Sequence, residues 1–297
     1  MAYQFNLLRK KHPKFYYHKY SVEYQDGSLK FRFYLEIEPE IHFTPEVIIR
    51  DIDEHKVLRV GQPVLDNIAF HLGLMEIPSY WKAACSPEIC VLAGNMDDFQ
   101  LSWWRDLLIK GMGEFFYKNN IDINKPDLFN FNVSGNQSFY VEPFRDRLDN
   151  AGYLVPIGGG KDSAVSYELL KQANKEVTCW SLNPTESVLA HFRMNQDYKP
   201  IIVTRSIDKA LLDLNKKGYL NGHTPFSAYL AFASTACSIL FGLGNVAFSN
   251  ERSSNEGNVY FKGTEVNHQY SKSFDFEKRF RDYASRYRQS LCNPEYE

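Results

Sequence analysis

The segment that most restricts the fold of this chain is a glycine-rich loop between a predicted strand and a predicted helix. It consists of Gly158, Gly159, Gly160, Lys161, Asp162 and Ser163. The apolar run at 153–157 precedes it and is typical of a buried parallel strand, with Pro156 near the end, where a missing N–H is tolerated. A second strand is predicted at 177–180. Strand, loop, helix and strand then fit within about thirty residues, the size of a βαβ unit.

The helix after the loop is predicted over 162–173, with Asp162 and Ser163 in its first turn. Its apolar face is expected to comprise Val165, Leu169 and Ala173, which recur at a four-residue spacing. Three glycines permit positive φ angles and close approach of backbone N–H groups to an anion, and the helix N-terminus adds its dipole. The loop is therefore predicted to hold phosphate. The alternative is a glycine-rich turn without a ligand, which requires fewer of these residue types.

The spacing decides which kind of phosphate loop this is. A Walker A loop requires GxxxxGK followed by Ser or Thr, but here Lys161 is followed by Asp162 and the expected first glycine is Val155. The segment instead resembles the SGGxDS signature of the PP-loop ATP pyrophosphatases, with Gly158 in place of the first serine. This resemblance implies a grip on the β,γ-pyrophosphate of ATP, cleavage to AMP and pyrophosphate, Asp162 near Mg²⁺ and Ser163 on a phosphate oxygen.

Further units of the same domain are predicted downstream. A strand at 200–204 leads into a helix capped by Ser206. Thr224 as N-cap and Pro225 at the first helical position open a largely apolar helix of about sixteen residues, too short and too polar for a membrane span. A central strand is predicted at 245–249. Polar and ionisable side chains crowd the residues after it, as a site at the carboxyl edge of a parallel sheet requires.

Several separate motifs carry a more specific resemblance. In order along the chain they are GGGKDS, NGH with Thr-Pro, SNERSS with EGN, and VNHQYSKS. This series is similar to the UDP-N-acetyl-α-D-muramoyl-L-alanyl-L-glutamate epimerase family of bacterial peptidoglycan synthesis. The similarity is close over 152–280 and looser around Ser79-Tyr80-Trp81-Lys82-Ala83. Members of that family continue well beyond the point where this chain ends, so the chain is expected to be either a fragment or a relative with a shortened C-terminal domain.

The resemblance implies an isomerase that uses ATP and Mg²⁺ to invert the terminal L-Glu of UDP-MurNAc-L-Ala-L-Glu to D-Glu. The glutamate carboxylate is expected to be adenylated, because an acyl-adenylate has a far more acidic α-carbon than a free carboxylate. A base on one face and an acid on the other then exchange the α-proton, and hydrolysis releases the product. Peptidoglycan precursor biosynthesis, and with it cell wall biogenesis, is the process implied.

The candidate site residues fall into three groups. Those predicted to transfer protons or to contact the substrate are His223, Glu251, His268 and Lys272. Those predicted to bind the nucleotide are the six loop residues together with Asn250 and Arg252, and Asp162 is the predicted metal ligand. Each has a structural alternative: His223 as a capping or packing residue, His268 and Lys272 as parts of a surface loop, and Glu251 in an ion pair with Arg252.

Composition excludes several other classes of protein. The net charge of −2 and the pI near 6.5 give no general attraction to nucleic acid, so no nucleic-acid partner is expected. The first thirteen residues contain no signal-peptide core, so we expect a cytoplasmic protein without membrane insertion. Five cysteines, an odd number, argue against a disulfide framework. Cys85 and Cys90 are interpreted as free thiols rather than zinc ligands, and Cys179 and Cys237 as core residues rather than a racemase acid–base pair.

The first half of the chain differs in character. Residues 1–145 are predicted to form a smaller α+β domain that helps to bind the UDP-sugar peptide, in front of a parallel-sheet, PP-loop (adenine nucleotide α-hydrolase-like) α/β domain at 146–297. A β-hairpin is expected across Asp26-Gly27, because apolar residues alternate strictly on the strand that follows. A strand at 41–49 and helices at 63–72 and from Asp97 are also expected. The aromatic strand residues and Trp81 are interpreted as core rather than as stacking platforms.

Two rival functions remain open from the sequence. The first is another PP-loop ATP pyrophosphatase, such as a tRNA-modifying thiolase or an amide-forming ligase. A thiolase ordinarily shows a paired-cysteine motif and a basic RNA surface, and neither is visible here. The second is a nucleotide-binding module without turnover.

Overall fold

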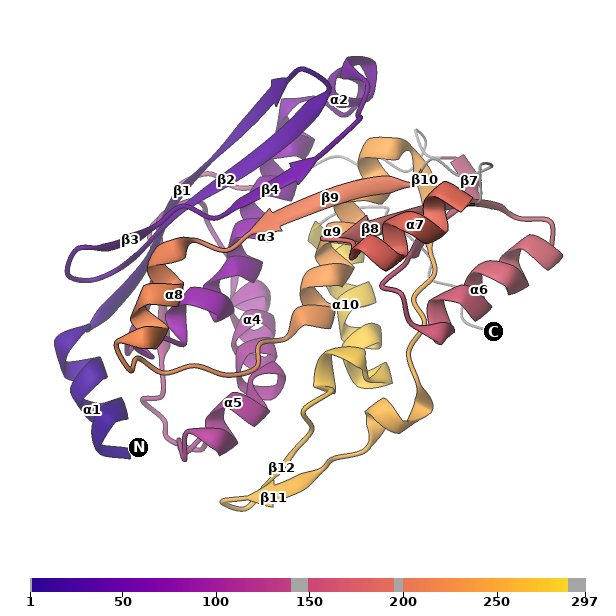
Figure 1. Cartoon of the computed structure of the whole chain (residues 1–297). Coiled ribbons are helices and arrows are strands. Elements are labelled where there is room, and N and C mark those ends of the chain that lie inside the picture. The colour runs from indigo at the N-terminus through magenta and orange to yellow at the C-terminus, as the bar shows by residue number, and fades with distance from the viewer. Residues whose placement is uncertain (1, 140–148, 195–199, 288–297) are drawn as a thin grey trace.

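The computed structural model describes residues 2–139, 149–194 and 200–287. Its strands form one large mixed sheet in the order β10-β7-β8-β9-β4-β2-β1-β5-β6, with β3 paired to β2 (Figure 1). A separate two-stranded ribbon consists of β11 and β12. The prediction of an α/β chain is thereby confirmed at the level of a mixed α/β architecture with a large central sheet.

The N-terminal half is built around a long hairpin. Its strands are β1 (Lys14–Gln25), β2 (Ser28–Ile37), β3 (Ile41–Phe43), β4 (Glu46–Ile49), β5 (Glu88–Val91) and β6 (Asn130–Val133). Its helices are α1 (Ala2–Lys11), α2 (Glu54–Val60), α3 (Gln62–Trp81), α4 (Asp98–Gly111) and α5 (Gly113–Lys118). The predicted hairpin is confirmed, since Asp26 (φ 49°) and Gly27 (φ 70°) have the positive φ angles of a two-residue turn.

Two predictions in this half are corrected. The single strand expected at 41–49 is divided into β3 and β4, both of which pair with β2. The helix expected at 63–72 continues to Trp81, because Gly73 does not end it. A Cβ atom at Gly73 would overlap the hydroxyl group of Tyr17, so this glycine allows α3 to pack closely on β1. Trp81 is fully buried, as a core residue should be.

The second half supplies the parallel strands. The elements are β7 (Asp149–Pro156), α6 (Lys161–Gln172), β8 (Glu176–Leu182), α7 (Glu186–Met194), β9 (Ile201–Ser206), α8 (Lys209–Lys216), α9 (Phe226–Phe241) and β10 (Leu243–Val246). After them come the 3₁₀ helix η2 (Arg252–Asn255), β11 (Val259–Phe261), β12 (Thr264–Val266), the 3₁₀ helix η3 (Tyr270–Lys272) and α10 (Phe274–Tyr287). The predicted strand, glycine loop, helix and strand are confirmed as β7, the loop, α6 and β8.

The order of the parallel strands creates a switch point. Strand β7 lies between β8, the next strand in sequence, and β10, which returns to its other side. In open α/β sheets, ligands bind in the crevice at the carboxyl ends of two such strands. The prediction that the strand around 245–249 is central is wrong. Within the described residues β10 pairs with β7 alone and ends the sheet.

Side chains of β8 divide between two cores. Trp180 belongs to the large core shared with α3, α4 and α9, whereas Cys179 belongs to a small cluster with Tyr167, Val188 and Phe192 from α6 and α7. Because successive strand residues point to opposite faces, α6 and α7 cover one face of the parallel strands and α9 the other. The glycine loop opens on the face with the small core.

Three helix details differ from the predictions. Asp208, not Ser206, caps α8, and its carboxylate accepts a hydrogen bond from the N–H of Ala210 (2.8 Å). Helix α9 begins at Phe226, one residue later than expected, with Pro225 at the N-cap. The predicted apolar face of α6 is wrong: Val165 and Leu169 are 56% and 60% exposed, and Tyr167 is buried instead. The aromatic ring occupies the core-facing side of α6 because it buries more apolar surface there.

The sheet is continuous between the two halves. Strand β4 pairs antiparallel with β9 (Figure 1). A buried ion pair between Glu76 of α3 and Arg205 of β9 adds a second link. The large core likewise contains residues from both halves. The predicted boundary at 145/146 lies outside the described residues, so the division into two domains stays a prediction.

Helix α10 is fixed to the N-terminal half through Tyr283. Its buried hydroxyl oxygen accepts hydrogen bonds from Nε2 of Gln100 (3.1 Å) and Nε1 of Trp104 (2.9 Å), and lies 2.9 Å from Nε2 of His71. These three partners lie on α3 and α4. The segment that precedes α10, with the predicted site residues His268 and Lys272, is therefore held against the N-terminal half. No described helix has both the length and the apolar character of a membrane span.

Candidate functional site

The glycine loop leaves the carboxyl end of β7 and becomes the N-terminus of α6. Gly159 has φ 88°, a conformation that side chains rarely adopt, and a Cβ atom there would also press on Val188. Gly160 is the N-cap of α6 and offers no side-chain acceptor, while the hydroxyl of Ser163 donates to the Gly160 carbonyl (3.0 Å). The N–H groups of the first turn therefore remain available to an anion.

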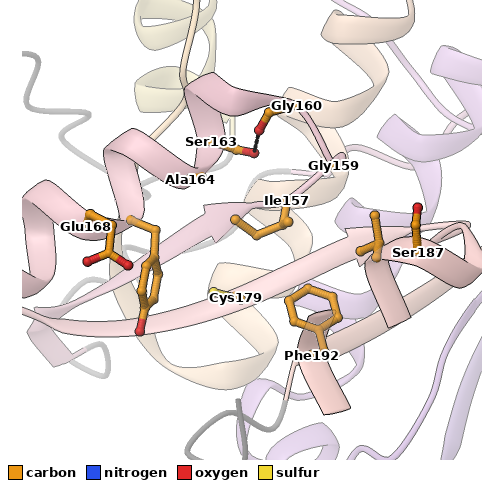
Figure 2. Close-up of a pocket in the computed structure, with 11 residues that line it drawn as sticks. Ile157, Gly159, Gly160, Ser163, Ala164, Glu168, Cys179, Ser187 and Phe192 are labelled. Atoms are coloured by element: carbon orange, nitrogen blue, oxygen red, sulfur yellow. Dashed lines mark hydrogen bonds between the residues drawn. The ribbon is translucent and has the colours of Figure 1, made fainter. Parts of the chain in front are cut away.

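A cavity of about 370 Å³ adjoins this loop (Figure 2). It is lined by Ile157, Gly159, Gly160, Ser163, Ala164, Tyr167, Glu168, Cys179, Ser187, Val188 and Phe192. Figure 2 shows the Ser163–Gly160 hydrogen bond at one end and the ring of Phe192 on α7 at the other. The volume is within the range of small-molecule sites, which combine apolar walls with a few polar groups. A phosphorylated ligand with a planar ring fits this combination.

The thiol of Cys179 faces this cavity but is not poised to react. Burial raises its pKa to about 11, although Lys171 acts in the opposite direction. Burial also raises the pKa of Cys85 and Cys237. These thiols are therefore protonated at neutral pH, which agrees with the interpretation of Cys179 and Cys237 as core residues and of Cys85 as a free thiol.

A rise in the Cys179 pKa from 9.0 to about 11 lowers the thiolate fraction at pH 8 about 100-fold. Iodoacetamide is therefore expected to alkylate Cys179 in the folded protein about 100-fold more slowly than in the urea-unfolded chain, a difference that peptide mass spectrometry can follow. Equal rates in the two states would show that folding does not raise the pKa of this thiol, and a faster rate in the folded protein would show that it is activated.

The polar segment after β10 begins next to the strand that leads into the glycine loop. The backbone N–H of Ala247 donates to the Leu154 carbonyl (2.9 Å), which continues the pairing of β10 with β7. The hydroxyl oxygens of Ser249 and Ser166 are 2.7 Å apart, so the segment touches α6. Asn250, the next residue, is exposed to solvent. The switch point therefore brings the start of the third sequence motif against the helix that follows the first motif.

A second group of predicted residues surrounds Glu114 on α5. Nδ1 of His223 lies 3.8 Å from a carboxylate oxygen of Glu114, which also pairs with Lys118. Burial lowers the pKa of His223 below its ordinary value of 6.5; the charge of Glu114 opposes this, and that of His268 adds to it. Both histidines help Lys118 to lower the pKa of Glu114. His223 and His268, 45 positions apart in sequence, thus both interact electrostatically with Glu114. These three residues and Lys82, which also acts on His223, are called the histidine cluster below.

His268 is held by the motif that precedes it. The side-chain oxygen of Asn258 contacts both Nδ1 of His268 and its backbone N–H. The amide of Asn267 donates to the Ser254 carbonyl (2.7 Å), which ties the loop to η2. The imidazole is exposed, yet its position is fixed by these hydrogen bonds.

Other predicted residues lie outside this cluster. Glu251, Arg252 and Lys272 are exposed, and the nearest partner of the Glu251 carboxylate is the Ser253 hydroxyl (3.2 Å). No ion pair joins Glu251 to Arg252 in the described part of the chain. Their assigned roles stay predictions, as does that of Asp162, which is half-buried in the first turn of α6. Among the described residues, no group of three or more His, Cys, Asp or Glu side chains is placed to hold a metal.

Two residues of the histidine cluster were not selected from the sequence. Lys82, directly after α3, is buried, and its ammonium donates to the Gly222 carbonyl (2.7 Å) next to His223. Burial, with a smaller effect of the Arg205 charge, lowers its pKa to about 8. Glu114 carries no sequence signal at all. For Lys82, the only indication from the sequence was its place in the segment 79–83, which resembles the family more loosely.

Comparisons with known proteins identify a family and three relatives. The family model described as the MurL N-terminal domain matches residues 7–293. A protein from a Micromonospora strain is 31% identical over 266 residues, covering 89% of this chain and 58% of the relative. A relative from Salinispora tropica is 32% identical over 67% of this chain and 42% of its own length. A relative from Xanthomonas oryzae pv. oryzae is 33% identical over 73% of this chain and 47% of its own length. All three are named UDP-N-acetyl-α-D-muramoyl-L-alanyl-L-glutamate epimerase.

The chain thus spans about half the length of the curated relatives it matches. No solved structure matches it.

Proposed function

Because the chain belongs to the MurL N-terminal domain family, we propose that it takes part in inverting the terminal L-Glu of UDP-MurNAc-L-Ala-L-Glu to D-Glu. Three relatives named for this epimerisation, at 31–33% identity, support the proposal. The process would be peptidoglycan precursor synthesis in the cytoplasm. The observation that carries the chemistry is the glycine loop at the N-terminus of α6, beside a cavity at the switch point of the parallel strands.

ATP is the proposed co-substrate, held with its phosphates at the glycine loop. The free first-turn N–H groups, the helix dipole and the hydroxyl of Ser163 suit a pyrophosphate, and the apolar wall that includes Phe192 suits adenine. Mg²⁺ is usually bound by one or two carboxylates together with substrate phosphates, so the single carboxylate of Asp162 fits it. When bound, the metal would neutralise phosphate charge.

Activation and inversion follow in three balanced steps. An oxygen of the glutamate α-carboxylate attacks the α-phosphorus of ATP, the bond to the β-phosphate oxygen breaks, and pyrophosphate leaves. A base removes the acidified α-proton, and an acid returns a proton to the opposite face of the α-carbon. Water then hydrolyses the adenylate to AMP and the D-Glu product. His223 and His268 are proposed as the proton-transfer pair, since one cluster holds both.

The proposal is tested by incubating the chain with ATP, Mg²⁺ and UDP-MurNAc-L-Ala-L-Glu. AMP release and the chirality of glutamate recovered after acid hydrolysis are measured together. Substrate-dependent AMP with D-glutamate is expected. AMP without D-glutamate would retain the pyrophosphatase chemistry and reject the epimerase. Tight ATP binding without AMP would favour a nucleotide-binding module, and sulfur transfer to tRNA would favour a thiolase.

A further inference from the structure

Lys82 is a buried cation without a full negative charge beside it. The residue is 9% exposed, and one of the three N–H donors of its ammonium is used, by the Gly222 carbonyl. No carboxylate in the described part of the chain lies within 4.0 Å of its ammonium. Burying an unpaired charge is costly unless a partner neutralises it. The position therefore suits an anion that arrives with a ligand.

The neighbouring charges do not supply that anion. The Arg205 guanidinium is already paired with Glu76, through contacts of 2.8 and 2.6 Å, and Glu114 is paired with Lys118. Among Lys82, Arg205, Glu76, Glu114 and Lys118, three cations face two carboxylates. With neutral histidines nearby, these five residues carry an excess of one positive charge, and that charge lies on the buried Lys82.

The two histidines of the cluster are accessible to solvent. The His223 side chain is 37% exposed and His268 is exposed, whereas Lys82 is buried and donates to the carbonyl of Gly222, the residue before His223. A ligand with a carboxylate two or three bonds from the reacting carbon would place that carbon beside His223.

From this arrangement we propose that Lys82 forms a subsite for the γ-carboxylate of the substrate glutamate. The inference rests on the proposed function, because the α-carboxylate is the group that must be activated to acidify the α-proton. The γ-carboxylate then remains the free anion. Its ion pair with Lys82 fixes one end of the glutamyl group and sets the α-carbon between the proton-transfer residues.

The test compares the binding of UDP-MurNAc-L-Ala-L-Glu and UDP-MurNAc-L-Ala-L-Gln to the full chain by calorimetry without ATP. The second probe replaces the γ-carboxylate with an amide of the same shape. Wild-type protein is expected to bind the glutamate form about 10- to 100-fold more tightly, as charge-assisted hydrogen bonds predict. Lys82→Met should reduce this preference to near onefold with little change for the glutamine form. Lys216→Met, a surface lysine of α8, is the matched control and should keep the preference.

A measurement on the wild type avoids any folding defect of the variant. Imidazole NMR signals of His223, assigned with His223→Ala, should titrate at higher pH when the glutamate probe is bound, and less so with the glutamine probe. Equal binding of both probes by wild type, or a preference that survives in Lys82→Met, overturns the subsite. A Lys82-dependent preference without AMP or D-glutamate formation retains the subsite and rejects the epimerase.

Discussion

Replacing Glu76 with Gln is expected to lower the free energy of unfolding by about 3–5 kcal/mol, because it leaves the charge of Arg205 buried without a partner. Glu76 is fully buried, and its two carboxylate oxygens accept from Nε (2.8 Å) and a terminal nitrogen (2.6 Å) of Arg205. The guanidinium also donates to the Ser79 hydroxyl (2.9 Å) and lies 4.4 Å from the Tyr229 ring centre. Urea unfolding followed by circular dichroism measures the loss.

Glu46→Gln is the matched control. Glu46 pairs with Arg32 through similarly short contacts, but its side chain is 23% exposed and that of Arg32 is 37% exposed. Exposed ion pairs contribute about 0–1 kcal/mol, so this variant should lose no more than that. A double variant, Glu76→Leu with Arg205→Met, should be more stable than Glu76→Gln alone, because it removes both buried charges. Equal losses at Glu76 and Glu46 would contradict this account of the pair.

Replacing His223 or His268 with Ala is expected to slow glutamate inversion by about 10²–10⁴-fold while AMP formation continues. The two steps are expected to separate because the histidine cluster and the glycine loop are assembled from different elements. The measurement is deuterium incorporation at the glutamate α-carbon from heavy water, with AMP followed in the same sample. His42→Ala, an exposed histidine of β3, is the control and should leave both rates unchanged.

The pH dependence of inversion gives a further check on His223. Because burial lowers its pKa below 6.5, the imidazole is neutral and able to accept a proton at pH 7. As the pH falls through that pKa, the base becomes protonated and the rate of inversion should fall. Between about pH 7 and the pKa of Lys82 near 8, the rate of inversion should stay constant. Near-full turnover in both alanine variants would show that other groups move the proton.

The sequence predicted elements whose causes are local. The glycine loop, the strand before it and the helix after it were predicted from about twenty adjacent residues, and the hairpin from Asp26-Gly27. Local chemistry settles these features, because backbone conformation, capping and strand alternation act over a few positions. The order of the polar motifs was likewise sufficient to indicate the family, which the match over 7–293 confirms.

Sequence periodicity was insufficient where packing partners decide the outcome. The four-residue spacing of Val165 and Leu169 predicted a buried face, yet Tyr167 is the residue that packs on the sheet. Periodicity shows that a helix has an apolar side, but the neighbouring elements determine which side is covered. The edge position of β10 also depends on strand pairing, since a short apolar strand has the same sequence pattern at the edge of a sheet and in its centre.

What the sequence alone determined about this protein is the glycine loop between its strand and helix, and the family to which the chain belongs. What only the tertiary structure decided is the union of both halves in one sheet through β4 and β9, and the cluster of Lys82, Glu114, His223 and His268. The physical reason is distance along the chain. Lys82 and Gly222 are 140 positions apart, and no local propensity encodes a contact of that range.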